Sequence, residues 1–292
     1  MQPNYSEIFK ILDEHKCVVE KKIHDELLTF GADTKLKEAC AYALLNGGKR
    51  FRPVIVLLCA KAIGKNCDVS DAALAVEFFH TASLIADDFP CMDNDDLRRN
   101  KPSLHKAFGE ATALLASYAL ISAGYRSIYK NAVIMKEGAE KAFLLAIENA
   151  TQNTGILGAT GGQFLDLYPP NQDVDTLKEI LNKKTVTLFE VAFVLGWIFG
   201  GGDLKKISIV KQVAYHWGMA FQIADDLDDI AQDNTQEREV NLASVIGLKP
   251  ATKLFHEEIF LLKAKMKELS LDTKDFLAMV SALEQSFPRA MP

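Results

Sequence analysis

Two groups of aspartates, far apart in the chain, are the residues whose type and spacing point most directly to chemistry. Each group comes at the end of a strongly apolar stretch. Their members are Asp87, Asp88 and Asp93 in the first group and Asp225, Asp226 and Asp229 in the second. Like charges at this density repel one another, and the repulsion grows as water is excluded. A solvated acidic helix end would explain one such group, but two groups with apolar flanks favour a cation-binding site.

The oxygen ligands indicate which cation. Carboxylates are hard ligands, and Mg²⁺ typically takes one or two of them together with waters and the phosphate oxygens of a substrate. Asp225, Asp226 and Asp229 have helical spacing, so their side chains can share one face of a helix. In the first group, Pro90 should interrupt the helix and bring Asp93 back toward the preceding pair. We therefore predict a multi-metal Mg²⁺ site built from both groups.

Cationic segments complement these acidic groups. Residues 47–53 (GGKRFRP) form a glycine-rich turn with three cations at a helix start, where backbone N–H groups favour an anion. Arg98 and Arg99 directly follow the first acidic group, and arginine binds phosphate oxygens in a bidentate manner. Lys184 and Thr185 form a third candidate. Each segment alone is compatible with an ordinary solvated surface, but together they predict a diphosphate site.

Two polar residues of the apolar helices have the spacing to face the same site. His80 lies two helical turns before Asp87, and Gln222 lies three residues before Asp225. A lone helical histidine is more often a structural residue than a ligand. The position of His80 below an acidic group makes a diphosphate contact the sharper interpretation.

The bulk composition limits the function classes. The chain has 292 residues, a net charge of −6 and 49% hydrophobic residues, as in a globular protein with a large core. Nucleic-acid binding is not expected, because it needs a basic face. No signal peptide is visible. The most apolar run, residues 186–202, contains Glu190 and falls short of the ~20 apolar residues of a membrane span. The five cysteines lack CxxC spacing, so we expect reduced thiols and a cytoplasmic protein.

Helical periodicity runs through almost the whole chain, and strand-type alternation is essentially absent. Apolar residues recur at three- and four-residue spacing in residues 8–30, 36–45, 54–63, 72–86, 107–129, 139–167, 177–199 and 207–230. Glycines at several of the breaks suit helix ends. No linker or low-complexity tract divides the chain. The sequence predicts one all-α domain, residues 1–292, of ten or more helices.

The order of these motifs resembles the trans-prenyltransferases. These are the short-chain isoprenyl diphosphate synthases of the polyprenyl synthetase family, which include farnesyl and geranylgeranyl diphosphate synthases. The segments that carry the resemblance are GGKRFRP, HTASLIADDFPCMDNDDLRRNKPSLHKAFG, GATGGQFLDL, KKT and FQIADDLDD. The resemblance implies an isoprenoid-synthase-type helical bundle around a deep central cavity, usually in a homodimer.

The resemblance also implies a reaction. Isopentenyl diphosphate would condense head to tail with an allylic diphosphate, namely dimethylallyl, geranyl or farnesyl diphosphate. Three Mg²⁺ ions would connect the allylic diphosphate to both aspartate motifs and stabilise the departing diphosphate. An allylic carbocation would form, the isopentenyl double bond would attack it, and a proton would be lost.

Residue by residue, the resemblance implies the following roles. The metal ligands would be Asp87, Asp88, Asp93, Asp225, Asp226 and Asp229. The allylic diphosphate would contact Arg98, Lys184, Thr185 and Gln222. The isopentenyl diphosphate would contact Lys49, Arg52, His80 and Arg99, with Phe221 packed near the isopentenyl tail. The residues implied to act most directly in catalysis are Asp87, Asp88, Arg98, Lys184 and Asp225.

The chain departs from the family pattern in a few places. After the second motif the family usually carries lysines that cover the allylic diphosphate. Here Glu239 takes the place of one of them, and Arg238 could partly substitute. Asn100 replaces a usual glycine after the arginine pair, and Ser117-Tyr118 replaces a usual Gly-Asp. These changes bear on the expected affinity more than on the expected chemistry.

Product length is expected to depend on the helix before Asp87. Ala82 and Ser83 lie where farnesyl-specific members tend to carry a bulky aromatic, so a growing tail can pass further along the helix. Phe79 lies one turn deeper, and we interpret it as the floor of the tail pocket. This favours the twenty-carbon product, geranylgeranyl diphosphate. The alternative is the fifteen-carbon product of a farnesyl diphosphate synthase, a geranyltranstransferase.

Two other functions fit parts of the sequence. A class I terpene cyclase would share the helical bundle and the first metal motif, but it normally has a mixed Asn/Ser/Glu second motif and no isopentenyl site. A weakly active or regulatory prenyltransferase subunit should have a degraded aspartate motif, whereas both motifs are intact here. The missing lysines near Glu239 keep this second alternative open.

Overall fold

The computed structural model describes residues 5–231 and 241–286. These residues form fourteen α-helices, one π-helical and one 3₁₀ segment, and a two-stranded hairpin, which confirms the predicted all-α fold of ten or more helices. In chain order the elements are α1 (Tyr5–Leu27), α2 (Lys35–Leu44), α3 (Phe51–Ile63), α4 (Ser70–Asp87), β1 (Leu97–Arg98), β2 (Lys101–Pro102), α5 (Leu104–Phe108), α6 (Glu110–Val133), α7 (Ala139–Thr154), α8 (Ala159–Leu167), α9 (Val174–Leu181), η1 (Asn182–Val186), α10 (Thr187–Phe199), η2 (Leu204–Lys206), α11 (Ile207–Ala231), α12 (Leu242–Ile246), α13 (Leu248–Glu268) and α14 (Lys274–Ser286).

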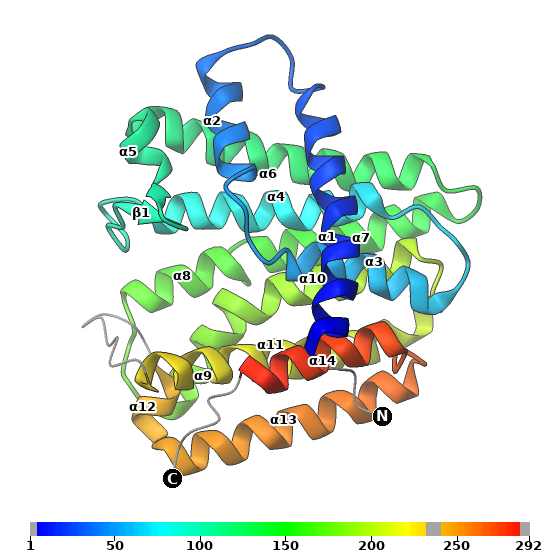
Figure 1. The fold of residues 1–292 in the computed structure, drawn as a ribbon, viewed down its shortest axis with the longest axis vertical. Helices are drawn as coiled ribbons and strands as arrows, with labels where there is room; N and C mark the ends of the chain where they lie inside the picture. Colours follow the sequence, from blue (N-terminus) through cyan, green and yellow to red (C-terminus); the bar gives the residue numbers. More distant parts are fainter. Residues whose placement is uncertain (1–4, 232–240, 287–292) are drawn as a thin grey trace.

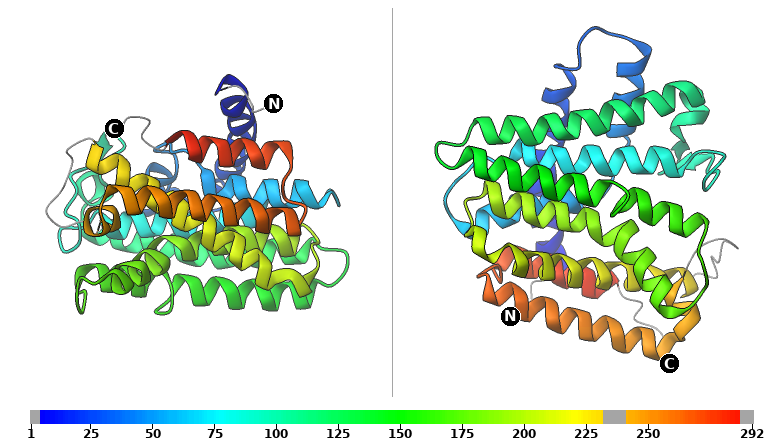
Figure 2. Two further views of the ribbon diagram at one scale, coloured as in Figure 1. Left: turned by 90° about the horizontal axis from the view of Figure 1, so that it is seen from below. Right: turned by 180° about the vertical axis from the view of Figure 1, so that it is seen from behind.

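The long helices lie side by side in a layered bundle, and two helices cross it. In Figure 1, α4, α6, α11 and α13 run across the molecule, while α1 and α2 lie at a steep angle to them. Figure 2 shows α6 and α7 on the opposite face from α1. The C-terminal ends of α4 and α11 lie at the same edge of the bundle, on the left of Figure 1. The fold thus brings the two aspartate groups to one side.

The core is built around α10, which is apolar on all sides. Every residue of α10 except Glu190 is buried, as expected of a helix enclosed by others. Glu190 accepts hydrogen bonds from Asn149 and Asn153 of α7, so its carboxylate is not left unpaired in the core. Gly196 permits a close approach of α3, because a Cβ there would lie 2.7 Å from the Cβ of Cys59.

Local chemistry fixes the helix ends that matter for the site. Helix α4 ends at Asp87, three residues before Pro90, as the sequence predicts. Helix α3 begins at Phe51 within the GGKRFRP turn and ends at Ile63, where Gly64, with a φ of 77°, is the C-cap. Thr34 caps α2 by accepting a hydrogen bond from the Lys37 N–H at 3.2 Å.

The structure corrects three details of the predicted helices. The periodic segment 139–167 is two helices, because residues 155–158 form a turn between α7 and α8. The segment 177–199 contains a π-helical turn, η1, between α9 and α10. Strands are present, although only as the short antiparallel pair of β1 and β2. Apolar periodicity is insensitive to such breaks, because the residues on either side of them still face the core.

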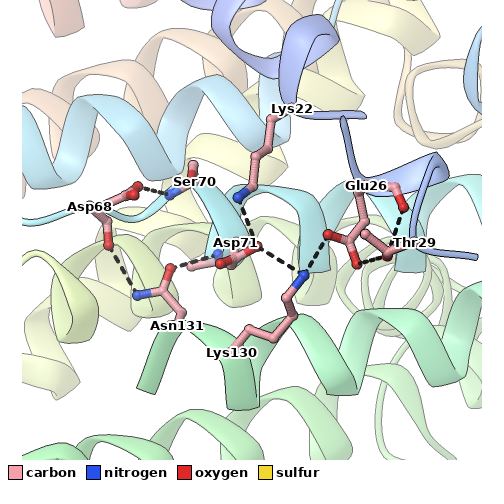
Figure 3. A network of polar contacts seen from close by, with 9 residues as sticks. Lys22, Glu26, Thr29, Asp68, Ser70, Asp71, Lys130 and Asn131 are labelled. Atoms are coloured by element: carbon pink, nitrogen blue, oxygen red, sulfur yellow. Dashed lines mark hydrogen bonds and ion pairs between the residues drawn. The ribbon is translucent and has the colours of Figure 1, made fainter. Parts of the chain in front are cut away.

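Helix α1 is held to the bundle by a polar network (Figure 3). Lys22 of α1 lies 3.2 Å from Asp71 at the start of α4, and Glu26 of α1 pairs with Lys130 of α6 at 2.5 Å. Lys130 also lies 4.0 Å from Asp71. These pairs join three helices that are distant in sequence, and they fix the position of α1 along the bundle.

No helix in the described ranges, 5–231 and 241–286, is long and apolar enough to cross a membrane. The single domain of residues 1–292 stays a prediction.

Candidate active site

The first aspartate motif lies in a tight turn at the end of α4. The Asp93 N–H donates to the Asp87 carbonyl oxygen at 2.9 Å, which folds the chain back toward the helix end. Burial raises the pKa of the Asp87 carboxyl to about 7, while Lys184 acts in the opposite direction and Asp93 adds to the rise. The predicted return of Asp93 to the preceding aspartates is therefore present in the backbone.

The arginine pair lies on the β1–β2 hairpin next to this turn. Arg98 Nε donates to Asp88 Oδ1 at 2.8 Å, and its Nη2 also contacts Asp95 Oδ2 at 3.1 Å. The two turn residues, Arg99 and Asn100, both have positive φ, of 54° and 63°. A two-residue hairpin turn requires this conformation at both positions, and asparagine tolerates it better than most residues. Asn100 can therefore stand where the family usually has glycine.

The second aspartate motif lies on the last turns of α11. Asp226 accepts hydrogen bonds from Gln222 Nε2 at 2.9 Å and from the Leu242 N–H at 2.8 Å. Burial raises the pKa of Asp226 to about 6, and these two hydrogen bonds oppose the rise. Burial, and then the nearby Asp229, also raise the pKa of Asp225, while Lys49 opposes that rise. Asp225 is exposed whereas Asp226 is buried, so the shared face of the three aspartates stays a prediction.

A cationic pocket lies beside the second motif. The guanidinium of Arg52 lies over the Phe189 ring, 4.3 Å from its centroid, and its Nη1 is 3.5 Å from His80 Nε2. Burial lowers the pKa of Arg52 to about 10, which leaves it charged at neutral pH. Burial, and then the charge of Arg52, hold the pKa of His80 well below its ordinary value. His80 is therefore neutral at pH 7.

Arg99 completes this pocket by packing on the glycine pair. It donates a hydrogen bond to the Gly47 carbonyl oxygen. A Cβ at Gly48, where φ is +122°, would lie 2.7 Å from the Arg99 guanidinium. The absence of a side chain at Gly48 is therefore what lets the two cationic segments of the sequence meet.

Lys184 and Thr185 lie on η1 and connect the two aspartate motifs. Lys184 Nζ pairs with Asp166 of α8 at 2.6 Å. Burial acts to lower the pKa of Lys184, but Asp166, followed by Asp87 and Asp93, outweighs it and leaves the pKa above its ordinary value. Thr185 Oγ1 donates to Gln222 Oε1 at 3.0 Å, and the same Gln222 holds Asp226.

A cavity of about 990 Å³ opens between α1, α3, α4, α11 and α14. It brings together predicted residues from four separate segments, namely Lys49, Arg52, His80, Arg99, Thr185, Phe221, Gln222 and Asp225. Its wall also includes apolar residues, among them Leu12, Trp217 and Met279. The predicted residues Asp87, Asp88, Asp93, Arg98, Lys184, Asp226 and Asp229 do not line this cavity, although the contacts above connect Lys184 and Asp226 to it.

The three residues assigned to product length lie between α4 and α6. Phe79 is 3% exposed, and its ring packs against Tyr125 at a centroid distance of 5.0 Å. A Cβ at Gly124 would lie 2.5 Å from the Phe79 ring. Ala82 is also buried, and Ser83 Oγ donates to the His80 carbonyl oxygen. These residues do not line the 990 Å³ cavity.

The sequence analysis missed two residues, Arg50 and Asp166, that help to position the site. Arg50 is buried and does not face solvent as a free cation. It binds the Leu44 carbonyl oxygen and the carboxylates of Glu77 on α4 and Glu20 on α1. Asp166 was likewise not singled out, although it lies in the GATGGQFLDL segment. Nothing in the local sequence pattern marks these partners, because they come from distant helices.

The side chains of the two motifs fit divalent magnesium by their donor chemistry. They offer carboxylate oxygens, and burial raises the pKa values of the half-buried Asp87 and the buried Asp226. A bound cation would relieve that unfavourable state. Among residues 5–231 and 241–286, no group of three or more His, Cys, Asp or Glu side chains forms a metal-holding cluster by itself.

The comparisons with known proteins agree with this geometry. Residues 33–241 match the polyprenyl synthetase family model. The chain belongs to the polyprenyl synthetase family. A farnesyl diphosphate synthase of Geobacillus stearothermophilus is 37% identical over 76% of this chain and 75% of its own length. A geranylgeranyl synthase relative in Arabidopsis thaliana, the heterodimeric large subunit 2, is 37% identical over 71% of this chain.

Solved structures of the polyprenyl synthetase type also share the fold. A geranyltransferase from Legionella pneumophila superposes with a TM-score of 0.83 at 26% identity, covering 97% of this chain and 98% of that one. An FPP/GFPP synthase from Zymomonas mobilis gives a TM-score of 0.81 at 28% identity, covering 96% and 99%. The match to the Arabidopsis large subunit spans 56% of that protein's length.

The replacement of the usual family lysines cannot be located in space. Glu239 and Arg238 lie outside the described residues.

Proposed function

We propose that the protein is a short-chain prenyltransferase that condenses isopentenyl diphosphate with an allylic diphosphate. The observation that carries this proposal is the connection between the two aspartate motifs. The charges of Asp87 and Asp93 raise the pKa of Lys184, its neighbour Thr185 donates to Gln222, and Gln222 donates to Asp226. A chain of interactions through η1 thus relates the two motifs, and a metal–diphosphate complex between them would use both.

In this proposal the allylic diphosphate lies between the motifs. Asp87, Asp88 and Asp93 would hold magnesium from one side, and Asp225, Asp226 and Asp229 from the other, with three ions expected. When bound, Mg²⁺ would neutralise charge that develops on the departing diphosphate. Lys184, now paired with Asp166, and Arg98, now paired with Asp88, would donate to the same oxygens. The allylic C–O bond breaks with its electrons moving to diphosphate, the isopentenyl double bond forms the new C–C bond, and one proton leaves.

The cationic pocket suits the second substrate. Lys49, Arg52 and Arg99 would bind isopentenyl diphosphate, and the neutral His80 can donate a hydrogen bond to it. Phe221 lies at the boundary of this pocket, with its ring 5.2 Å from Phe189 and 6.3 Å from Phe51. These rings would pack on the five-carbon tail. The aromatic wall also keeps water from the reacting carbons.

A turnover assay tests the proposal. The purified chain is incubated with Mg²⁺, isopentenyl diphosphate and each of dimethylallyl, geranyl and farnesyl diphosphate, and the products are analysed. We expect a longer linear diphosphate. A cyclic hydrocarbon would instead identify a class I terpene cyclase. No turnover alone, but turnover with a partner prenyltransferase, would identify a regulatory subunit.

We propose geranylgeranyl diphosphate as the product, with farnesyl diphosphate as the alternative. The support is the small Ala82 beside the buried Phe79, as described above. Replacing Phe79 with Ala should shift the products to longer chains. Phe78→Ala is the matched control, because Phe78 is equally buried but packs against Phe30 on another side of α4. Leucine variants at both positions serve if either alanine variant fails to fold. An unchanged product distribution in Phe79→Ala would show that Phe79 is not the floor of the tail pocket.

We also propose a homodimer that uses the back face of α6. A stripe of apolar side chains on α6 is exposed, with members separated by three, four or eight residues, so that they share one face: Leu114, Tyr118, Ile121, Tyr129 and Val133. Such a stripe favours packing against a second helix. Tyr129→Glu should convert the dimer to a monomer in light scattering, whereas Phe260→Glu on α13, a similarly exposed aromatic, should not. The cytoplasmic location stays a prediction.

A further inference from the structure

Helix α1 forms one wall of the cavity that we assign to isopentenyl diphosphate. Leu12, Asp13 and Lys16 of α1 line it together with Lys49, Arg52 and Arg99. Lys16 is half-buried. Neither α1 nor Lys16 belongs to the motifs that the sequence analysis singled out. The question is what a lysine does at this position.

The position of α1 against the cationic turn is fixed by charge. Glu20 of α1 accepts a hydrogen bond from Arg50 Nε at 2.8 Å, and Arg50 belongs to the GGKRFRP turn. Further along α1, the pairs of Lys22 and Glu26 with α4 and α6 hold the same helix (Figure 3). Arg50 also binds the buried Glu77 of α4 and the Leu44 carbonyl oxygen. Arg50 therefore connects α1, the turn and α4.

Helical spacing then places Lys16 above the turn. Leu12, Lys16 and Glu20 follow one another at intervals of four residues, so they lie on one face of α1. Glu20 contacts the turn itself, Lys16 lies one helical turn further toward the N-terminus, and Leu12 reaches the apolar wall. The face of α1 that is anchored to the cationic turn is therefore the face that looks into the cavity.

Lys16 differs from the two arginines beside it in having no partner. Arg50 has two carboxylates, and Arg99 has the Gly47 carbonyl oxygen. In the part of the chain that the structure describes, Lys16 forms no hydrogen bond or ion pair, and Asp13, four-fifths of a turn away, does not reach it. The cavity is also lined by carboxylates, but Glu77 is paired with Arg50, and neither Asp225 nor Asp228 forms an ion pair with Lys16. An ammonium without a partner beside Lys49, Arg52 and Arg99 favours the entry of an anion.

We propose that Lys16 is a substrate-binding residue that contacts the diphosphate of isopentenyl diphosphate from the α1 side. The inference rests on the proposed function and adds a residue to it. The lysine supplies charge-assisted hydrogen bonds to the phosphate oxygens. Glu20 and Arg50 are positioning residues, which keep α1 at the depth where Lys16 reaches the ligand.

The test compares Lys16→Gln with Lys21→Gln. Lys21 is an exposed lysine of the same helix that does not line the cavity, so both variants lose the same charge from α1. For Lys16→Gln we expect the KM for isopentenyl diphosphate to rise on the order of tenfold, as the loss of one charge-assisted contact implies. The KM for the allylic diphosphate and kcat should change less than twofold to threefold. Lys21→Gln should behave as the wild type.

A rescue variant and a binding measurement distinguish a direct contact between Lys16 and diphosphate from a general effect on the fold. Lys16→Arg should restore the KM to within a few-fold of the wild type, and thermal unfolding should show that all three variants fold. Calorimetry with inorganic diphosphate, without allylic substrate, should show weaker binding by Lys16→Gln. Equal KM values in the Lys16→Gln and Lys21→Gln variants would overturn the inference. Absence of turnover in the wild type would overturn the proposed function instead, while the diphosphate titration would still decide the role of Lys16.

Discussion

The two aspartate motifs have the same composition but different surroundings. The first lies after a helix end, and its carboxylates face basic side chains: Asp88 is paired with Arg98, and Lys184 faces Asp87 and Asp93. The second lies within a helix, and its Asp226 is satisfied by an amide and by backbone N–H groups. The first motif is thus balanced by charge, and the second by hydrogen bonds.

The difference indicates a division of work. Cations beside the first motif can exchange a carboxylate for a diphosphate oxygen when metal and substrate arrive. The donors around Asp226 cannot move in this way, because two of them are the Asn241 side chain and the Leu242 backbone N–H, which are held in place at the start of α12. We therefore expect the first motif to adapt to substrate and the second to be a rigid support. Four predictions test this contrast.

The largest effect should come from removing one carboxylate from either motif. Asp87→Asn and Asp225→Asn should each lower kcat/KM on the order of a hundredfold to a thousandfold, because both motifs must hold metal at once. The control is Asp96→Asn, since Asp96 is an exposed partner of Lys106 beside the first motif. Steady-state assays over a range of Mg²⁺ concentrations give the measurement. If only one of the two variants lost activity, the aspartate that was replaced in the other variant would be dispensable.

The next effect concerns the cation of the first motif. Asp166→Asn should raise the KM for the allylic diphosphate by about tenfold, because Lys184 then lacks the carboxylate that directs it. Glu179→Gln is the matched control, since Glu179 pairs with the adjacent Lys183. If both variants had the same KM as the wild type, Lys184 would not depend on Asp166.

A smaller effect tests the rigid support of the second motif. Asn241 caps α12 and donates to the Asp226 carbonyl oxygen at 2.9 Å, so Asn241→Ala should lower the free energy of unfolding by about 1 kcal/mol. It should also lower kcat, because it loosens Asp226. Thr34→Ala removes a comparable cap from α2, away from the site. Urea unfolding and turnover assays should show equal stability losses but a loss of activity in Asn241→Ala alone.

The smallest effect concerns the helix that carries the first motif. Burial and the charges of Arg52, Arg99, Arg50 and Arg98 lower the pKa of His80 in the folded protein. Below pH ~6.5 the unfolded chain therefore binds a proton at His80 that the folded protein does not, and the free energy of unfolding falls as the pH decreases.

His80→Asn isolates this contribution. Urea unfolding between pH 7.5 and pH 5.5, for both proteins, should give a smaller loss of stability for the variant at the acidic end. The carboxyl groups with raised pKa values act in the opposite sense, but they are common to both proteins. Parallel pH dependences would mean that His80 takes up its proton in the folded state.

Much of this arrangement could be predicted from local sequence. Helical periodicity predicted the fold class, and the spacing of Asp225, Asp226 and Asp229 predicted that all three lie on one helix, α11. Pro90 correctly marked the end of α4. The resemblance to the family added nine residues for the two substrate sites, of which seven line one cavity together with Asp225 of the second aspartate motif. These features depend on neighbours within a few residues, which a sequence displays directly.

Other features depend on residues that meet only in three dimensions. The Lys184–Asp166 pair joins η1 to α8, and Arg50 reaches Glu20 and Glu77 on two further helices. The π-helical turn at Lys184 has no local signal, since its sequence is ordinary for an α-helix. Local patterns also could not show that Arg50, one of the three cations of the GGKRFRP turn, is enclosed by carboxylates.

The contact between Phe79 and Gly124 bears on how product length could change during evolution. The Phe79 ring occupies the space that a side chain at position 124 would need, with only 2.5 Å available to a Cβ. A single added methyl group on α6 would therefore force the ring to move while α4 kept its sequence. Two positions that are distant in the gene can thus alter the packing around one ring. If Phe79 is the floor that we propose, lineages could reach the same product by substitutions that a comparison of α4 alone would never reveal.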